Sequence, residues 1–312
     1  MIHTRTIGTS SLFVFPLNLG GNVFGWTADE PTSFAVLDAF VAAGGNFIDT
    51  ADSYSAWAPG NTGGESEVII GNWRKHNPGA DVIVATKVSR HPEFRGLIPG
   101  NVRAGLQASL ERLQTDTVDV YYAHYDDPDV PMNEIAHVFS ELKDSGRITE
   151  IGISNFSAAR IREWFATARA NGYHLPVAFQ PGYHLLDREY ENELREVAAD
   201  EQLGVFPYYS LAAGFLTGKY TRSSSLDVER SRMIKNYAND RGFRVVNVMG
   251  EIAKELGTHH TAIALAWLLA QPTITAPIAS ARNTEQLAAI LEFASVELSP
   301  DHLARLDQAS RS

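Results

Sequence analysis

The sequence contains no cysteine, which excludes disulfide bonds and thiolate chemistry and makes the cytoplasm the default compartment. Long apolar runs are also missing, because the longest one, residues 262–270, is far shorter than the roughly 20 residues of a membrane-spanning helix. The residues before Ser10 mix His3 and Arg5 with small polar side chains, which is not the basic and then apolar pattern of a secretory signal. We therefore expect a cytoplasmic protein without a membrane anchor.

Positive charge is scarce as well. The chain has 26 lysine and arginine residues against 37 aspartate and glutamate residues, a formal net charge of −11. Nucleic acids and anionic membranes are bound through basic surfaces, so we expect neither as the main partner. A small anionic cofactor stays compatible with this charge, because a few local cations and helix N-termini are enough to hold phosphate groups.

Low-complexity segments, short-period repeats and linkers long enough to separate two domains are absent too. The hydrophobic content of 44% and the charged content of 20% are ordinary for a globular protein. A length of 312 residues suits a single α/β barrel with added loops. We expect residues 1–312 to form one domain.

The chain does contain a regular alternation of apolar strands and amphipathic helices. We expect a β-hairpin with a Gly/Ser turn over residues 7–14 and an irregular stretch over residues 210–241. Strands are expected at residues 17–21, 47–48, 82–87, 118–124, 148–154, 177–180, 204–208 and 275–278. Helices are expected at residues 32–43, 65–75, 101–113, 132–145, 157–171, 189–202, 245–256, 261–269, 284–293 and 301–308.

About eight strands that alternate with helices are typical of a parallel sheet, and eight such units favour closure into a (β/α)8 barrel. The alternative is an open doubly wound sheet, which usually carries a G-x-G-x-x-G phosphate loop after its first strand. Residues 20–25 read Gly-Gly-Asn-Val-Phe-Gly and lack that order. We therefore predict an α/β fold, a (β/α)8 TIM barrel with an N-terminal β-hairpin and extra C-terminal helices.

Three polar residues, Asp49, Lys87 and His124, end successive expected strands, and Tyr54 lies in the loop after the first of these strands. In a barrel, the carboxyl ends of the strands share one rim, which holds the active site. Taken singly, the four have other interpretations: a turn acid, a solvated lysine, a buried histidine and a rim aromatic. Together they place an acid, a base and two proton carriers on neighbouring strand ends, which favours catalysis.

These side chains suit the delivery of a proton to a carbonyl oxygen. Tyrosine has an ordinary pKa of about 10, and we expect the nearby ammonium of Lys87 to lower the pKa of Tyr54. Asp49 would supply the counter-charge for a buried lysine, and a neutral His124 would donate a hydrogen bond to the same oxygen. No side chain of the four delivers a hydride, so a cofactor has to supply it.

Residues 44–54, which read Gly-Gly-Asn-Phe-Ile-Asp-Thr-Ala-Asp-Ser-Tyr, and the four side chains above resemble the signature and the Asp-Tyr-Lys-His tetrad of the aldo-keto reductases. Residues 146–155, which read Gly-Arg-Ile-Thr-Glu-Ile-Gly-Ile-Ser-Asn, resemble the second signature of that family. The resemblance extends along nearly the whole chain. It implies an NADPH-dependent oxidoreductase that reduces an aldehyde or ketone to an alcohol, with Tyr54 as general acid and with Asp49, Lys87 and His124 as its catalytic partners.

The resemblance also implies a nicotinamide site. Ser154, Asn155 and Gln180 would bind the carboxamide, although the first two would equally suit a cap for the helix expected from residue 157. Tyr208 would stack on the nicotinamide ring. Tyr209-Ser210 replaces the more common Ser-Pro of the family, and for Tyr209 we favour packing of the strand. The pyrophosphate would follow the backbone of Leu211, Gly214, Leu216 and Lys219.

Residues 279–287 resemble the adenosine-phosphate segment of the family, where Ser280, Arg282 and Gln286 would bind the cofactor. Ser280 and Arg282 precede an expected helix N-terminus, which favours an anion, and a guanidinium binds phosphate through two parallel hydrogen bonds. This favours NADPH/NADP+ over NADH, because only the former carries a 2′-phosphate. The alternative is a solvated arginine near a helix start, and Ala289-Ile290 replaces the Glu-Asn that is common in the family.

Trp26, Trp57 and Tyr125 are expected to line a substrate pocket beside Tyr54 and His124, suited to flat or apolar small-molecule carbonyl compounds. The loop after Tyr54 is longer than the common Tyr-Gly pattern of the family, and Trp57 would equally suit a loop anchor.

A metal site is not expected. The neighbouring histidines at positions 259 and 260 point in different directions, and with Glu255 they give no convincing spacing for a third ligand.

A second interpretation is a nucleotide-binding regulatory subunit that resembles the potassium-channel β subunits. These share the barrel and the tetrad but act chiefly by binding a partner, and a fold alone does not settle function. The sequence shows no large exposed apolar stripe for docking, so the enzyme is favoured. The natural substrate, the direction of the reaction and the oligomeric state are not indicated.

Overall fold

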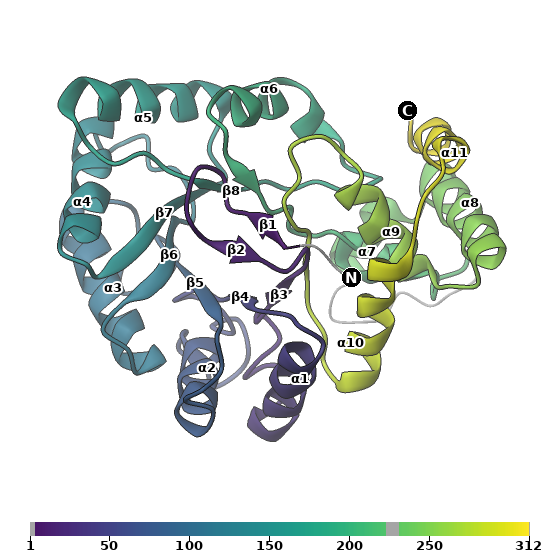
Figure 1. Cartoon of the computed structure of the whole chain (residues 1–312), viewed down its shortest axis with the longest axis horizontal. Coiled ribbons are helices and arrows are strands. Elements are labelled where there is room, and N and C mark those ends of the chain that lie inside the picture. The colour runs from purple at the N-terminus through teal and green to yellow at the C-terminus, as the bar shows by residue number, and fades with distance from the viewer. Residues whose placement is uncertain (1–3, 223–230, 312) are drawn as a thin grey trace.

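The computed structural model describes residues 4–222 and 231–311. Eight parallel strands form one sheet in the order β10 (Ile278–Ala279), β3 (Asn18–Gly20), β4 (Phe47–Asp49), β5 (Ile83–Val88), β6 (Val118–Ala123), β7 (Ile148–Ser154), β8 (Ala178–Gln180) and β9 (Gly204–Val205). The amide of Thr275 donates to the Val205 carbonyl at 2.8 Å, and that of Ile278 donates to the Pro207 carbonyl at 2.9 Å. These bonds join the two ends of the sheet, so the predicted (β/α)8 barrel is confirmed (Figure 1).

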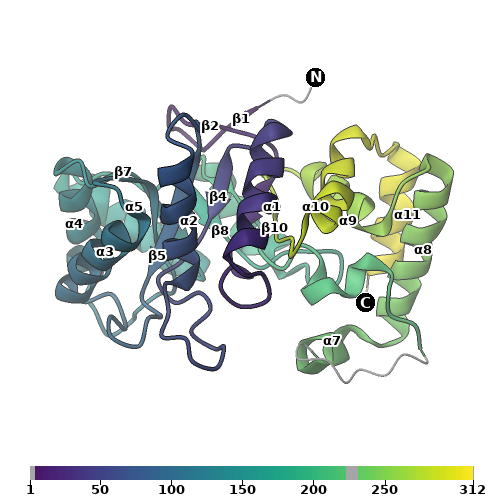
Figure 2. The same cartoon turned by 90° about the horizontal axis from the view of Figure 1, so that it is seen from below.

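Most of the helices surround the barrel and cover its outer face (Figure 1), whereas α7 (Ser231–Tyr237) lies apart from that layer (Figure 2). The other helices are α1 (Glu30–Ala42), α2 (Glu65–His76), α3 (Pro99–Leu113), α4 (Met132–Asp144), α5 (Ala158–Asn171), α6 (Glu193–Asp200), α8 (Asp240–Leu256), α9 (His260–Leu269), α10 (Thr284–Leu291) and α11 (Pro300–Ser310). Short 3-10 segments are η1 (Glu189–Glu191), η2 (Ala212–Thr217) and η3 (Glu292–Ser295). The extra C-terminal helix α11 packs along α8 at one side of the molecule (Figure 2).

The predicted hairpin is present as β1 (Arg5–Thr6) paired antiparallel with β2 (Phe13–Val14). It lies at the amino-terminal end of the barrel, where the Asn46 side chain just before β4 accepts from the Phe15 amide at 2.7 Å. Its turn needs glycine, because Gly8 has φ +50° and a Cβ there would lie 2.3 Å from the Val177 carbonyl oxygen. The hairpin leaves the carboxyl ends of the strands uncovered.

Side chains alternate between the barrel interior and the helix layer along each strand, as the period of two requires. Phe47, Ala85 and Tyr122 belong to the interior cluster, whereas Ile48 and Tyr121 pack in the cluster with the helices. Two positions beyond each interior residue, the same alternation points the next side chain into the carboxyl end of the barrel. Those next positions are Asp49, Lys87 and His124.

Some element boundaries differ from the prediction, for identifiable reasons. Helix α1 begins two residues early, at Glu30, because Asp29 caps it and Pro31 is tolerated in a first turn. The helix expected over residues 189–202 is split into η1 and α6 at Asn192, whose ψ of −117° is not helical.

The last two strands of the barrel in chain order are shorter than expected. Strand β9 ends at Val205, and β10 begins only at Ile278, with an isolated bridge at Ile274 in place of a continuous strand. Prolines at 207 and 277 interrupt the ladders, because proline has no amide to donate. The stretch expected to be irregular over residues 210–241 contains η2 and α7, and its residues 223–230 lie outside the described part.

Candidate active site

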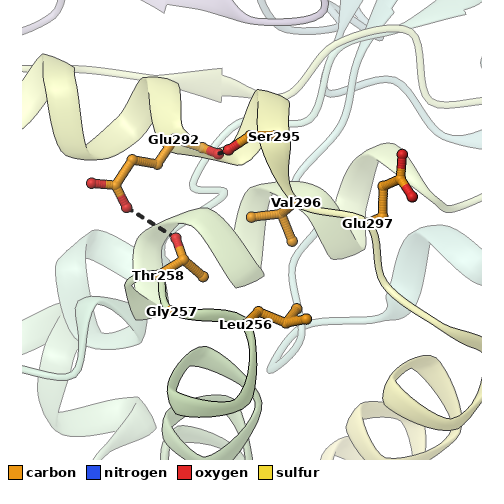
Figure 3. Close-up of a pocket in the computed structure, with 7 residues that line it drawn as sticks. All are labelled: Leu256, Gly257, Thr258, Glu292, Ser295, Val296 and Glu297. Carbon is orange, nitrogen blue, oxygen red and sulfur yellow. Dashed lines mark hydrogen bonds between the residues drawn. The ribbon is translucent and has the colours of Figure 1, made fainter.

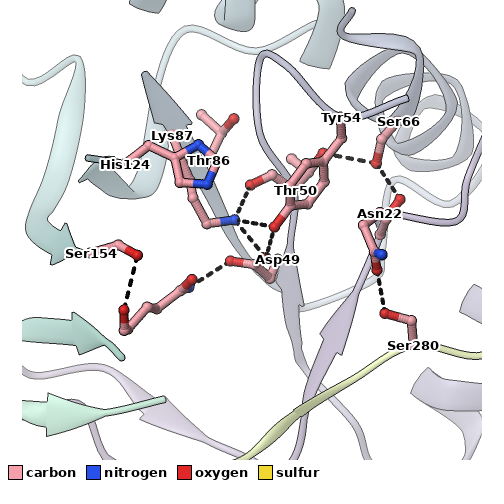
Figure 4. A network of polar contacts seen from close by, with 12 residues as sticks. Asn22, Asp49, Thr50, Tyr54, Ser66, Thr86, Lys87, His124, Ser154 and Ser280 are labelled. Atoms are coloured by element: carbon pink, nitrogen blue, oxygen red, sulfur yellow. Dashed lines mark hydrogen bonds and ion pairs between the residues drawn. The ribbon is translucent and has the colours of Figure 1, made fainter. Parts of the chain in front are cut away.

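Three of the predicted catalytic side chains form one hydrogen-bonded cluster at the carboxyl ends of β4 and β5 (Figure 4). The Nζ atom of Lys87 donates to Asp49 Oδ2 at 2.6 Å and to the Tyr54 hydroxyl at 2.8 Å. The Tyr54 hydroxyl in turn donates to Asp49 Oδ2 at 3.0 Å. His124 follows β6 directly, and its ring centroid lies 6.2 Å from that of Tyr54. The structure therefore brings all four residues together.

Two further polar residues hold this cluster in place. The third hydrogen bond of the Lys87 ammonium goes to the Thr50 carbonyl at 2.7 Å. The Thr50 hydroxyl donates to Ser66 at 2.8 Å, and the Ser66 hydroxyl donates to the Gly21 carbonyl at 2.8 Å. All three donors of the ammonium are therefore satisfied, as a buried charge requires. Thr50 and Ser66 were not among the predicted site residues, because a lone hydroxyl residue carries no spacing signal.

The electrostatics of Tyr54 differ from the expectation. Burial raises the pKa of Tyr54 well above its ordinary value, and the charge and hydrogen bond of Asp49 raise it further. The expected lowering by Lys87 is therefore not met, because the carboxylate that neutralises the ammonium also contacts the phenol. The phenol keeps its proton at neutral pH, which is the form that a proton donor needs.

Burial also sets the charge state of the neighbouring groups. It lowers the pKa of Lys87, and the adjacent Asp49 carboxylate opposes that shift. The salt bridge between them has both side chains 1% exposed. Burial lowers the pKa of His124 well below its ordinary value, and the charges of Lys87 and Arg90 add to this effect. His124 is therefore neutral, as expected, and its imidazole can donate one hydrogen bond.

The three residues predicted to bind the carboxamide lie next to the cluster. Gln180 Nε2 donates to Asp49 Oδ1 at 2.6 Å, so this amide already contacts the tetrad. The Asn155 amide donates to the His124 carbonyl at 2.9 Å and to Ser154 Oγ at 3.0 Å. The alternative role of Ser154 and Asn155 as a helix cap is wrong, because Ser157 caps α5 by accepting from the Arg160 amide.

Tyr208 lies on the same side of the rim. Its hydroxyl donates to Asn155 Oδ1 at 2.7 Å, and its ring covers Gly182, where an added Cβ would lie 3.3 Å from the ring. A cavity of about 180 Å³ adjoins Tyr208 and Asn155. The packing expected for Tyr209 is wrong: its side chain is 51% exposed at φ +56°, and its phenol is close enough to contribute to the raised pKa of Tyr54.

The segment that follows contains the residues predicted for the pyrophosphate. Ala212, Ala213 and Gly214 all have positive φ, of +48°, +55° and +95°. For the two alanines these conformations are strained, and such strain concentrates at ligand-binding sites. The Lys219 ammonium lies over this turn, 3.7 Å from the place of a Cβ on Gly214. Leu211 precedes the turn and Leu216 lies buried behind it.

Two of the residues predicted for the adenosine phosphate, Ser280 and Arg282, lie between β10 and α10, and the third, Gln286, lies in the first turn of α10. The Ser280 hydroxyl donates to the Asn22 side chain, which links this segment to the loop after β3 (Figure 4). The Arg282 side chain is exposed, and its backbone amide donates to Gln286 Oε1 at 3.1 Å. Asn283 caps α10. Asn22 was not among the predicted site residues.

Aromatic side chains surround Tyr54 on its open side. We call Trp26, Trp57, Tyr125 and Tyr209 the aromatic rim. The rings of Trp26 and Trp57 meet edge to face at 5.6 Å, and Trp57 lies 6.2 Å from Tyr54. Tyr125 lies 5.2 Å from His124. Trp57 is 51% exposed, so it does not anchor its loop in the core.

Other features of the molecule lie apart from these residues. A surface cavity of about 450 Å³ between the end of α8 and η3 is lined by none of the residues discussed above (Figure 3). Glu255 contacts His302 and Arg305, while His259 contacts Glu292. Across residues 4–222 and 231–311, no group of three or more histidine or acidic residues is arranged to hold a metal ion. No helix in this described part is long and apolar enough to cross a bilayer.

Comparison with known proteins identifies relatives along nearly the whole chain. YrpG, an uncharacterized oxidoreductase of Bacillus subtilis (strain 168), is 33% identical over 313 residues, which cover 96% of this chain and 94% of that protein. The aldo-keto reductase YhdN of the same organism is 33% identical over 88% of this chain and 82% of its own length. A probable voltage-gated potassium channel subunit β of Oryza sativa subsp. japonica is 32% identical over 91% of this chain and 88% of its own length.

The model of the aldo/keto reductase family matches residues 16–311. Members of this family are oxidoreductases that generally use NAD(P)H and act on small-molecule carbonyl compounds. The chain therefore belongs to the aldo/keto reductase family.

Proposed function

We propose that this chain is an NADPH-dependent reductase that converts an aldehyde or ketone to an alcohol, with residues 1–312 acting as one barrel domain. The observation that carries the proposal is the position of the Tyr54 hydroxyl, 2.8 Å from the Lys87 ammonium and 3.0 Å from Asp49. A protonated phenol beside a cation at the mouth of a barrel is suited to donate a proton to a carbonyl oxygen.

The side chains divide the work of proton transfer. Tyr54 donates its proton to the carbonyl oxygen, and Lys87 stabilises the phenolate charge that then develops. Asp49 keeps Lys87 charged in a buried site. The neutral His124 imidazole donates a hydrogen bond to the same carbonyl oxygen and orients it. A reduced nicotinamide, when bound, supplies the hydride for the carbonyl carbon.

The chemistry of the residues around the tetrad fits a nicotinamide dinucleotide. Ser154, Asn155 and Gln180 present a hydroxyl and two amides, which match the donors and acceptors of a carboxamide. Tyr208 offers a ring face beside them. The strained turn at Ala212–Gly214 and the Lys219 ammonium over it suit a pyrophosphate, with Leu211 and Leu216 as its flanks.

The preference for NADPH rests on Arg282. Its side chain is exposed beside the capped N-terminus of α10, together with Ser280 and Gln286. Within the described part of the chain, no carboxylate forms an ion pair with Arg282. A guanidinium without a partner acid is available for a 2′-phosphate.

The direct test is oxidation of NADPH by the purified protein against a panel of aldehydes and ketones. We expect turnover with at least one aromatic aldehyde, because the aromatic rim presents several ring faces around Tyr54. The control is the same panel without protein and with the Tyr54→Phe variant. Loss of NADPH at equal rates in all three would reject the proposal.

A second candidate is a nucleotide-binding regulatory subunit, because one relative is a probable potassium channel subunit β. This candidate predicts that NADPH stays bound through purification. It also predicts a catalytic rate slower than the rate at which cellular protein is degraded and resynthesised. A time course with an aldehyde and an excess of free NADPH over the NADPH-loaded protein separates the two. Multiple turnovers favour the reductase, whereas a single slow turnover favours the regulatory subunit.

A further inference from the structure

Arg90 places a positive charge at the edge of the tetrad. It follows β5 three positions after Lys87, and its guanidinium carbon lies 4.3 Å from the centroid of the Tyr125 ring. The Tyr125 ring lies 5.2 Å from that of His124, which lies 6.2 Å from that of Tyr54. A row of neighbouring rings therefore connects the guanidinium to the proposed proton donor.

The loop that carries Arg90 is fixed rather than free. Ser89 is buried, with φ +117°, a conformation that a serine adopts only when its surroundings impose it. Its hydroxyl accepts from the Tyr125 amide at 3.1 Å, and its carbonyl accepts from the Gly96 amide at 3.0 Å. These bonds fix the backbone just before Arg90, and one of them joins it to Tyr125, the residue whose ring the guanidinium contacts.

The charge of Arg90 is not neutralised by the acids nearby in the fold. Asp126, next to Tyr125, pairs with Arg160 at 2.8 Å, and Asp127 Oδ2 accepts from the Leu97 amide at 2.8 Å. The ion pairs found among residues 4–222 and 231–311 do not include Arg90. In a chain with a net charge of −11, an unpaired cation at this rim attracts anions locally.

We propose that Arg90 determines specificity by binding a carboxylate on an aromatic aldehyde or ketone. This inference rests on the proposed reductase function and names its substrate class. The aryl ring would lie against the aromatic rim, between Trp57 and Tyr125, while the carbonyl faces Tyr54. The guanidinium would bind the carboxylate through parallel hydrogen bonds. The carboxylate itself is unchanged, since the hydride enters the carbonyl carbon and the proton of Tyr54 enters the carbonyl oxygen.

The test compares 4-carboxybenzaldehyde with benzaldehyde, with NADPH as the reductant. We expect the wild-type protein to have the higher kcat/KM for the carboxylated aldehyde. In Arg90→Gln, the ratio of the two kcat/KM values falls about tenfold, because one charge-assisted contact is lost. Arg90→Lys gives an intermediate ratio, since the charge remains without the planar fork. Arg162→Gln is the control, because Arg162 makes only a 3.9 Å ion pair on the outer helix α5, and its ratio stays at the wild-type value.

A ratio in Arg90→Gln equal to that of the wild-type protein overturns the assignment and leaves the reductase proposal intact. If neither aldehyde is reduced, the proposed reductase function is rejected. The role of Arg90 is then tested by a binding measurement that does not depend on turnover. Tryptophan fluorescence of the wild-type and Arg90→Gln proteins is then titrated with 4-(hydroxymethyl)benzoate and with benzyl alcohol. Selective weakening of benzoate binding in the variant supports the anion site, and equal weakening or none refutes it.

Discussion

The Nζ atom of Lys87 lies 2.8 Å from the hydroxyl oxygen of Tyr54, although 33 positions separate the two residues in the chain. The contact exists because β4 and β5 are neighbouring parallel strands, with Asp49 paired to Ala85, two positions before Lys87. It joins a group that holds a proton to a group that stabilises the charge left when the proton departs.

Removal of the Tyr54 hydroxyl should abolish most catalysis without unfolding the protein. We expect Tyr54→Phe to lower kcat for carbonyl reduction by roughly 100-fold or more, because general acid catalysis contributes about that factor. Thermal unfolding followed by circular dichroism should stay near the wild-type curve. The matched control is Tyr173→Phe, whose ring packs on His137 away from the tetrad. Unchanged turnover in Tyr54→Phe would rule out its role as general acid.

Loss of the Lys87 charge should destabilise the fold through the carboxylate that it leaves behind. Lys87→Met leaves Asp49 buried without its cation, which costs roughly 3–5 kcal/mol of unfolding free energy. The double variant Lys87→Met/Asp49→Asn should recover most of that loss, because no buried charge then remains unpaired. Urea unfolding of the wild-type, single and double variants measures the coupling. A double variant as unstable as Lys87→Met would contradict this account.

The guanidinium of Arg282 should distinguish the two nicotinamide dinucleotides. We expect Arg282→Ala to raise KM for NADPH by about 10-fold or more and to change KM for NADH little, because only NADPH has a 2′-phosphate. Steady-state kinetics with both cofactors at a fixed aldehyde concentration provide the measurement. Arg162→Ala, on α5, controls for the loss of one positive charge. The phosphate assignment fails if KM for NADPH does not move.

The buried Asp52 should make stability depend on pH. Burial raises the pKa of Asp52 to about 8, and the charge of Glu67 adds to the shift. In the unfolded chain an aspartate has a pKa near 3.9, so between about pH 4 and pH 8 the folded state holds a proton that the unfolded state has lost. The free energy of unfolding therefore falls as pH rises through this window, and the full penalty is present above about pH 8.

Asp52→Asn removes this penalty. We expect its stabilisation relative to the wild-type protein to grow by on the order of 4 kcal/mol from about pH 5 to about pH 9. Thermal melts or urea unfolding across this range measure the difference. Asp129→Asn, at an exposed position, controls for the loss of one negative charge. A stabilisation that stays constant or shrinks with pH would show that Asp52 is ionised in the folded protein throughout.

The sequence alone predicted the barrel and the meeting of the tetrad, because these follow from strictly local rules. Residues two positions apart on a strand point to the same face, so Asp49 follows Phe47 and Lys87 follows Ala85 on the interior side of the barrel. The closure of eight such units then brings the strand ends to one rim. Both patterns are visible in the residues themselves.

Two of the predictions that were wrong concern the charge state and the packing of side chains at the site. The Tyr54 pKa was expected to fall, but it depends on burial and on one Asp49 oxygen that serves both Lys87 and the phenol. Tyr209 was expected to pack in the strand, but its φ of +56° turns it outward. Neither the sharing of an oxygen nor a backbone dihedral can be read from residue types.

The sequence by itself determined which chemical groups reach the carboxyl end of the barrel, since strand alternation and strand order are properties of the chain. Only the tertiary structure decided how those groups share hydrogen bonds and charge, including the Gln180 amide on Asp49 and the Arg90 guanidinium over Tyr125. The physical reason is that hydrogen bonds and desolvation depend on distances of a few tenths of an ångström between segments far apart in the chain. Those distances exist only once the barrel has closed.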